Sequence, residues 1–212
     1  MKHKTTQVLY AYWDELRAGS VAPRRFEIEP GRIGDILPDT FILEPARNQG
    51  FCFRLAGTRI CQRFGAELRG ADFLEGWSRA DRSLLEQHFS AITELGRVSV
   101  FLAEARSGAS KAVSLEILVL PLVHTGNALD RLLGSISVLE DPDWLPEEGL
   151  TSMRLLAAEA IWPEGRPDAV VDQLKRQSPF LPHVRNARMV RQDRRQFRVY
   201  DGGFGKGGGD KL

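Results

Sequence analysis

The sequence has only two cysteines, Cys52 and Cys61, among its 212 residues. Two cysteines do not build a disulfide framework, and without a Cys-x-x-Cys pair they do not indicate a zinc site. Long apolar runs are also missing, because the longest, residues 115–123, is interrupted by Glu116 and is far too short to cross a bilayer. The first residues are polar rather than an apolar signal segment, so we expect a cytoplasmic protein with reduced cysteines.

Motifs of enzyme active sites are absent as well. The chain has no Gly-x-Ser-x-Gly, no His-Glu-x-x-His and no paired-carboxylate motif. The glycine-rich residues 202–207 resemble a phosphate loop, but no Ser or Thr follows Lys206 and the chain ends before a helix could follow. We therefore predict a protein without catalytic residues and without a metal site.

The net charge of +1 hides a division of the chain into two parts. Residues 166–212 carry 11 basic and 5 acidic residues, which leaves 18 basic and 23 acidic residues in the first 165. Apolar periodicity fades beyond Pro163, so we expect residues 163–212 to form a basic, mostly disordered tail. An arginine series in this tail could follow nucleic-acid phosphates or an acidic protein surface, or could simply be solvated; its members are Arg185, Arg188, Arg191, Arg194, Arg195 and Arg198.

The N-terminal region, residues 1–30, reads as an amphipathic helix followed by an extended linker. An apolar stripe at helical spacing lies within residues 5–17, and it consists of Val8, Leu9, Tyr12, Trp13 and Leu16. So aromatic a stripe needs a surface to cover. We predict that it packs on the sheet of the body or across a two-fold dimer axis.

Residues 31–145 read as one α+β domain. Strand patterns cover residues 41–44, 51–55, 98–103, 113–123 and 132–139, and helical patterns cover residues 58–64 and 78–95. The first two strands flank a loop of turn-forming residues and are predicted to pair as a hairpin, with Phe51, Phe53 and Leu55 on one face. Five strands, hairpin connections and one helical crossover predict an antiparallel sheet with helices on one face and a cavity between them. A further helix is expected at residues 147–161, within a C-terminal segment 146–162.

Several short strings occur in an order that resembles a known family. They are Tyr12-Trp13-x-x-Leu16, Pro23-Arg24-Arg25, Ile28-x-Pro30, Leu37-Pro38, Phe53-Arg54-Leu55-Ala56-Gly57-Thr58, Phe64-Gly65, Leu118-x-Leu120-Pro121-Leu122 and Leu133-Gly134. The order of strands and helices and these strings together resemble the bacterial stand-alone PAS family, over roughly residues 8–145. Each string alone is weak, and the specificity lies in their sequence along the chain.

The resemblance implies a sensor or adaptor rather than a reaction. PAS domains bind small ligands in their cavity, or pair with partners, and pass on their state. For this chain it implies a non-enzymatic protein of bacterial signal transduction, a homodimer with a signalling protein partner and a small apolar or amphipathic ligand. The residues expected to line the pocket are Phe53, Arg54, Leu55, Arg59, Phe73, Trp77, Leu84, His88 and Ile92. The alternative is a nucleic-acid-associated regulator that contacts phosphates through the arginine series.

Three features near this pocket have competing interpretations, and the sequence identifies no cofactor. His88 lies on the apolar face of the long helix and could ligate a haem iron, but a hydrogen-bonded core histidine is the preferred interpretation. Cys52 and Cys61 lack the setting of the flavin-binding cysteine of light-sensing PAS domains and read as packing residues. Arg54 and Arg59 flank the Gly57-Thr58 turn and could bind an acidic ligand, although fixed salt bridges are the preferred interpretation.

Overall fold

The computed structural model describes residues 1–46, 50–109, 111–145 and 147–163. Three α-helices occur in this part of the chain, α1 (Lys4–Arg17), α2 (Thr58–Phe64) and α3 (Arg79–Leu95). Three short 3-10 turns, Arg25–Glu27, Pro30–Ile33 and Leu37–Asp39, follow α1. The tail and its arginine series lie outside the described residues.

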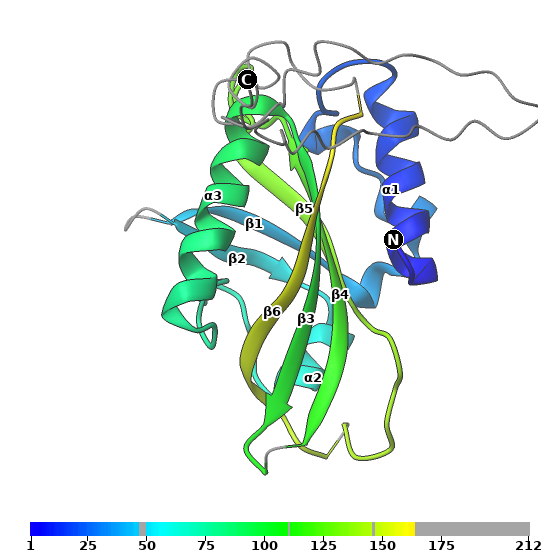
Figure 1. Ribbon diagram of the computed structural model, residues 1–212. Coiled ribbons are helices and arrows are strands. Elements are labelled where there is room, and N and C mark those ends of the chain that lie inside the picture. Colours follow the sequence, from blue (N-terminus) through cyan, green and yellow to red (C-terminus); the bar gives the residue numbers. More distant parts are fainter. Residues whose placement is uncertain (47–49, 110, 146, 164–212) are drawn as a thin grey trace, which may run out of the picture. The chain divides into compact units, whose positions relative to one another are not determined.

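One antiparallel sheet forms the centre of the fold, with the strand order β2-β1-β5-β4-β3-β6. Its strands are β1 (Thr40–Ala46), β2 (Gly50–Ala56), β3 (Val98–Ser107), β4 (Ala112–Leu122), β5 (Arg131–Val138) and β6 (Leu150–Ile161). The predicted hairpin is the β1–β2 pair, and Figure 1 shows it crossing the β3–β4 pair at a steep angle. The predicted α+β fold with an antiparallel sheet is confirmed, with a sixth strand added.

The sixth strand corrects the predicted C-terminal helix. Leu150–Ile161 is rich in alanine and leucine, which favour a helix, but it pairs with the whole length of β3. A bulge skips Leu156 in this pairing, so the residues do not alternate regularly between the two faces and the two-residue period of a strand is hidden in the sequence. Pairing with β6 gives hydrogen-bond partners to the backbone N–H and C=O groups along the edge of β3. The free energy gained in this way outweighs the local preference for a helix.

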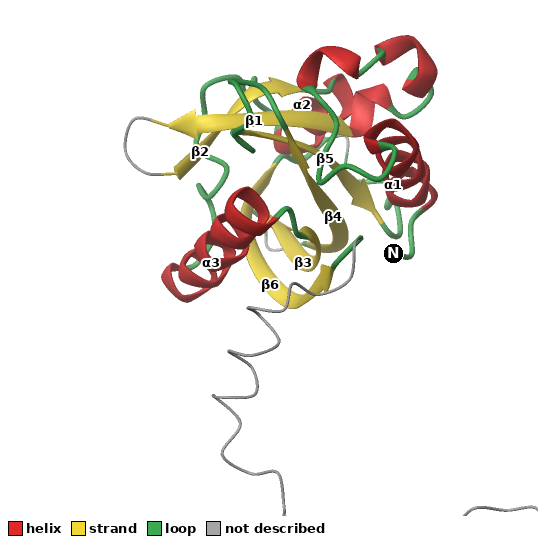
Figure 2. Ribbon diagram, turned by 90° about the horizontal axis from the view of Figure 1, so that it is seen from above, coloured by secondary structure: helices red, strands yellow, loops and turns green. Residues whose placement is uncertain are grey.

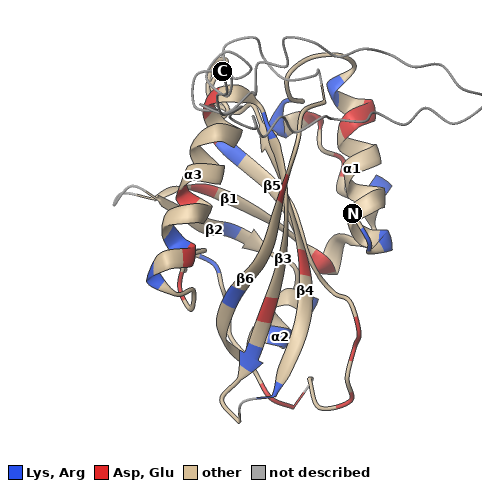
Figure 3. Ribbon diagram, viewed as in Figure 1, with Lys and Arg blue, Asp and Glu red and all other residues tan. Residues whose placement is uncertain are grey.

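The opposite edge of β6 is partly covered too. The amide of Met153 donates to the carbonyl of Gly76 at 2.9 Å, and the amide of Leu155 donates to a carboxylate oxygen of Asp81 at 3.3 Å. On its paired side, at the lower end in Figure 3, β6 meets charged residues of β3, where Glu104 pairs with Arg106 and with Arg154. On the opposite edge, the amides bonded at Met153 and Leu155 are not free to pair with another strand.

Helices cover both faces of the sheet. Figure 2 shows α3 on one side of the sheet and α1 on the other. Strand β4 explains this arrangement, because Leu115, Ile117 and Val119 point into the core under α3 while alternate residues point into the core under α1. The continuous apolar run of the sequence is therefore a strand that is buried on both faces.

The apolar stripe of the N-terminal helix packs in the core between α1 and the sheet. Leu9, Tyr12 and Trp13 are buried against the molecule's own sheet, and the indole N–H of Trp13 donates to the carbonyl of Pro121 at 2.8 Å. The two ends of the stripe, Val8 and Leu16, remain partly exposed. The first of the two predicted positions of this helix is therefore the observed one.

Glu116 anchors the start of α1. It is the one charged residue in the apolar run of β4, and it is almost completely buried on the face of the sheet that α1 covers. Its carboxylate accepts hydrogen bonds from the amides of Lys2 at 2.6 Å and His3 at 2.9 Å. Burial by itself would raise the pKa of Glu116, but these backbone hydrogen bonds lower it overall. The interruption of the run thus has a positioning role.

Candidate functional site

The space between the sheet and α3, where the ligand pocket was expected, is filled by a cluster of aromatic rings. Phe73 lies at its centre, with ring centroids 5.6 Å from Phe41, 5.5 Å from Phe53 and 5.4 Å from Phe89. Phe89 in turn contacts Phe51 at 5.3 Å. Such tilted and edge-to-face contacts are typical of a packed aromatic core.

The expected pocket residues divide into buried and exposed groups. Phe53, Phe73, Trp77 and Ile92 are buried in the core under α3. Leu55 and Leu84, in contrast, have exposed fractions of 44% and 48%. The two leucines therefore do not join the buried group, and the expectation that all nine residues line one pocket is corrected at these positions.

Each exposed leucine has a local reason. In the β1–β2 pairing, Ile42 lies opposite Leu55 and Leu43 opposite Phe53, so Arg54 is skipped by a bulge and Leu55 does not share the face of Phe53. On α3 the residues that point inward are Leu85, Phe89 and Ile92, spaced four and three residues apart. Leu84 lies at the border of this stripe and faces outward.

The two arginines near Gly57 are both engaged in ion pairs. Arg59 and Arg63 bind the carboxylate of Asp39, which is almost completely buried between the last 3-10 turn and α2. Arg54 lies on the surface, 4.0 Å from a carboxylate oxygen of Glu44. The structure therefore supports the salt-bridge interpretation of Arg54 and Arg59.

His88 is half-buried at the side of the aromatic cluster. Its ring packs edge-on against Phe101 at 5.1 Å, and Nδ1 lies 3.2 Å from the hydroxyl of Ser99. Burial and, secondly, the nearby charge of Arg97 lower the pKa of His88 to about 4. A neutral, hydrogen-bonded histidine at the edge of the core agrees with the preferred interpretation of this residue.

Lowering the solution pH from 6.5 toward 4 should destabilise the protein. The pKa of His88 in the folded protein, about 4, lies below its ordinary value of 6.5, so the unfolded chain binds the proton first. The stabilising contribution is complete above pH 6.5 and is lost as the pH falls toward 4. We expect a loss of about 1–2 kcal/mol, a figure discounted because the ring is only partly buried.

Urea denaturation at a series of pH values checks this prediction. The matched variant is His88→Gln, which keeps a hydrogen-bonding side chain but takes up no proton in this range. The variant should lose less stability than the wild type between pH 6.5 and 5, above the range in which carboxylates titrate. Equal slopes for the two proteins would show that His88 does not titrate as described.

Trp77 carries a polar atom without a partner. Its side chain is buried in the core under α3, and its indole N–H has no hydrogen-bond acceptor among the described residues. Buried donors of this kind are few in native proteins. This nitrogen is therefore the polar group within the aromatic core that a bound molecule could satisfy.

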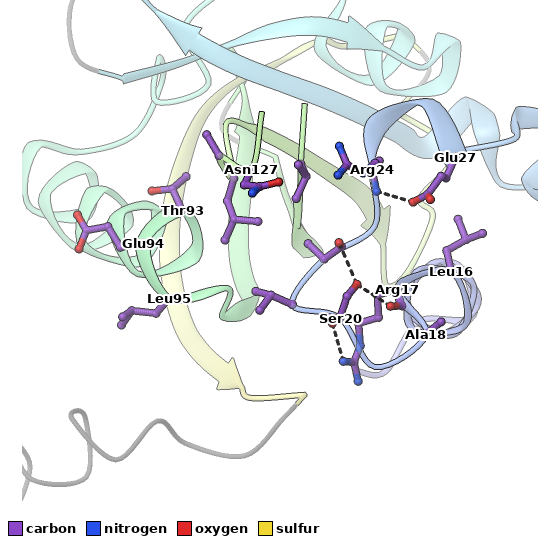
Figure 4. A pocket seen from close by; sticks show the side chains of 15 residues that line it. Leu16, Arg17, Ala18, Ser20, Arg24, Glu27, Thr93, Glu94, Leu95 and Asn127 are labelled. Carbon is purple, nitrogen blue, oxygen red and sulfur yellow. Dashed lines mark hydrogen bonds between the residues drawn. The ribbon is translucent and has the colours of Figure 1, made fainter. Parts of the chain in front are cut away.

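A hollow lies away from the aromatic core. It is a groove of about 1040 Å³ between the C-terminal ends of α1 and α3, and Figure 4 shows its lining side chains. One wall comes from the end of α1 and the linker after it, the other from the end of α3, and the loop between β4 and β5 closes it. Val21, Arg24, Glu94 and Leu95 are among the residues that line it. No sequence motif indicates this groove, because three separate segments of the chain build it, within residues 16–27, 93–95 and 123–129.

Metal-binding clusters and membrane-spanning helices are both missing from the described ranges. Within them, His, Cys, Asp and Glu side chains do not gather in groups of three or more that could hold a metal ion. Of the helices described, none combines the length and the apolar character needed to span a membrane.

The sheet order, the helices between β2 and β3 and the helical cover of the sheet define an α+β domain. A family model described as a PAS domain matches residues 1–137. The chain therefore belongs to the PAS domain family, whose general role is that of a signalling sensor or adaptor. No curated protein matches the chain. The matched residues end before β6, so this strand lies outside the family match.

Proposed function

We propose that this protein is a non-enzymatic, cytoplasmic PAS-type adaptor of bacterial signal transduction, which acts as a homodimer and passes its state on through a protein partner. The observation that carries this proposal is the aromatic cluster under α3. Where side chains of the chain itself fill the interior, a change of state is communicated through contacts at the surface. The family supplies the sensor or adaptor role, and the packed interior favours the adaptor.

Enlarging a side chain on the inner face of α3 tests whether this interior is packed. Ile92 is completely buried there, so Ile92→Trp should lower the free energy of unfolding by about 1–3 kcal/mol or more, because a close-packed core cannot absorb the added volume. The matched control is Gln87→Trp, at an exposed position of the same helix, which should change stability by less than about 0.5 kcal/mol. Urea denaturation measures both. A stable Ile92→Trp protein would indicate an open cavity and a ligand-binding sensor instead.

A small apolar or amphipathic ligand is the second candidate, and the unpartnered N–H of Trp77 favours it. A ligand with one hydrogen-bond acceptor and an apolar body would satisfy this nitrogen and contact the surrounding rings. Such a molecule should remain bound through purification and be lost from an Ile92→Trp protein that still folds. If the wild-type chain had the same mass under native and under denaturing conditions, such a ligand would be excluded.

A further inference from the structure

Among the charged side chains that line the groove between the ends of α1 and α3, Arg24 on one wall and Glu94 on the other have no ion-pair partner in the part of the chain that the structure describes. Arg24 stands on the linker wall and Glu94 on the α3 wall, and Figure 4 shows them on opposite sides of the hollow. The guanidinium of Arg24 makes one long contact, 3.5 Å to the carbonyl of Gly126, and has no carboxylate partner in the described part of the chain. Glu94 is exposed and likewise has no ion-pair partner among these residues.

The linker wall is rigid, so Arg24 is presented in a fixed place. The amide of Arg25 donates to the carbonyl of Val123 at 2.7 Å, and the amide of Val123 donates to the carbonyl of Pro23 at 3.0 Å. The carboxylate of Glu27 accepts the amide of Arg24 at 2.6 Å. These bonds tie the linker to the end of β4, which lowers the entropic cost of binding at this wall.

Apolar side chains are exposed around the same groove. Val21 and Leu95 line it and have exposed fractions of 51% and 41%, and Phe26, on the turn between Arg24 and Glu27, is 78% exposed. Isolated exposed apolar residues are ordinary, but several around one hollow, with charges at its rim, are typical of a protein contact surface.

We propose that this groove is the surface through which two copies of the chain associate about a two-fold axis. Under such an axis the same surface of each copy meets that of the other. Arg24 of each copy then faces Glu94 of the other, so the dimer contains two new ion pairs. The apolar residues around the groove are covered in the same contact. The N-terminal stripe packs on the molecule's own sheet, so most of it is not available for this contact.

A second copy fits this charge pattern better than a partner of one charge. A partner with an acidic surface would match Arg24 and repel Glu94, and a basic partner would do the reverse. Only a surface that carries both charges in the complementary arrangement satisfies both walls, and the groove itself is such a surface. The inference rests on the homodimer of the proposed function and assigns its location.

Charge exchange tests the proposal, with dimer dissociation constants measured by sedimentation equilibrium at low salt. Arg24→Glu and Glu94→Arg should each weaken the dimer roughly tenfold or more, because each replaces two attractions by two repulsions. An equimolar mixture of the two variants should associate about as well as the wild type, since the introduced carboxylate of one variant then faces the introduced guanidinium of the other. The matched control is Glu86→Arg, at an exposed position of the same helix, which should leave the dissociation constant within about twofold. Thermal melting of every variant checks that it folds.

The possible outcomes distinguish failure of the proposed dimer surface from failure of the homodimer itself. A monomeric wild type at all concentrations would overturn both the homodimer of the proposed function and this surface. A dimer that both variants retain would overturn the surface alone. Loss of the dimer in both variants, without recovery in their mixture, would also overturn it, because the specific Arg24–Glu94 contact predicts that recovery.

Discussion

Replacing Trp13 by glutamate should unfold the protein or cost it more than about 4 kcal/mol of stability. Trp13 is completely buried between α1 and the sheet, and its indole N–H binds the carbonyl of Pro121. The change leaves a cavity of aromatic size, removes that hydrogen bond and places an unpaired carboxylate in an apolar core. The loss belongs to the single molecule, since the helix packs on its own sheet.

Two further variants make the Trp13 prediction specific. Trp13→Phe keeps an aromatic ring but removes the N–H donor, so it should cost a smaller amount, about 1–3 kcal/mol. Val8→Glu lies on the same helix at a partly exposed position and should change stability by less than about 1 kcal/mol. Urea denaturation gives all three values. If Trp13→Glu kept wild-type stability, the packing of α1 on the sheet would be refuted.

The second large effect is expected at Gly134, in the middle of β5. A Cβ atom there would lie closer than 3.0 Å to both the ring of Phe41 and the backbone carbonyl of Leu118. The backbone of β4 cannot move aside without breaking the pairing of β4 with β5, so Gly134→Ala should cost about 3 kcal/mol or more. Thermal or urea denaturation measures the loss.

Gly50 is the matched control for Gly134. It also lies in a strand, β2, but a Cβ atom at this position meets no heavy atom within 4 Å. Gly50→Ala should therefore be neutral or slightly stabilising, because alanine restricts the unfolded chain more than glycine does. Similar losses at both positions would mean that the contact with Phe41 does not limit the space at Gly134.

The sequence was sufficient to predict the elements whose pattern is local. Helix α3 begins after Ser78, whose hydroxyl accepts the amide of Asp81, and ends at Gly96 with a positive φ of 68°, as its boundaries in the sequence indicate. The β1–β2 hairpin and strands β3 to β5 follow from their own apolar runs. These features depend on neighbouring residues and so are visible in the chain itself.

Features that depend on distant residues were predicted less well. Strand β6 has a helical composition, and only its pairing with β3 makes it a strand. The alternation of β2 places Leu55 on the wrong face, because a bulge arises from the pairing of two strands and has no signal in the sequence of either one. The groove brings together three separate segments of the chain, so Arg24 and Glu94 are placed on opposite walls only in the folded protein.

Native mass spectrometry of the purified protein tests most directly whether its interior is packed by its own side chains. Under native conditions we expect the mass of the chain and integer multiples of that mass. Under denaturing conditions we expect the mass of the single chain alone, with no further mass released. The absorbance spectrum should show only the protein's own aromatic band. A small molecule that stays bound under native conditions and is released on unfolding would contradict a packed interior, because it would show a ligand held inside the domain.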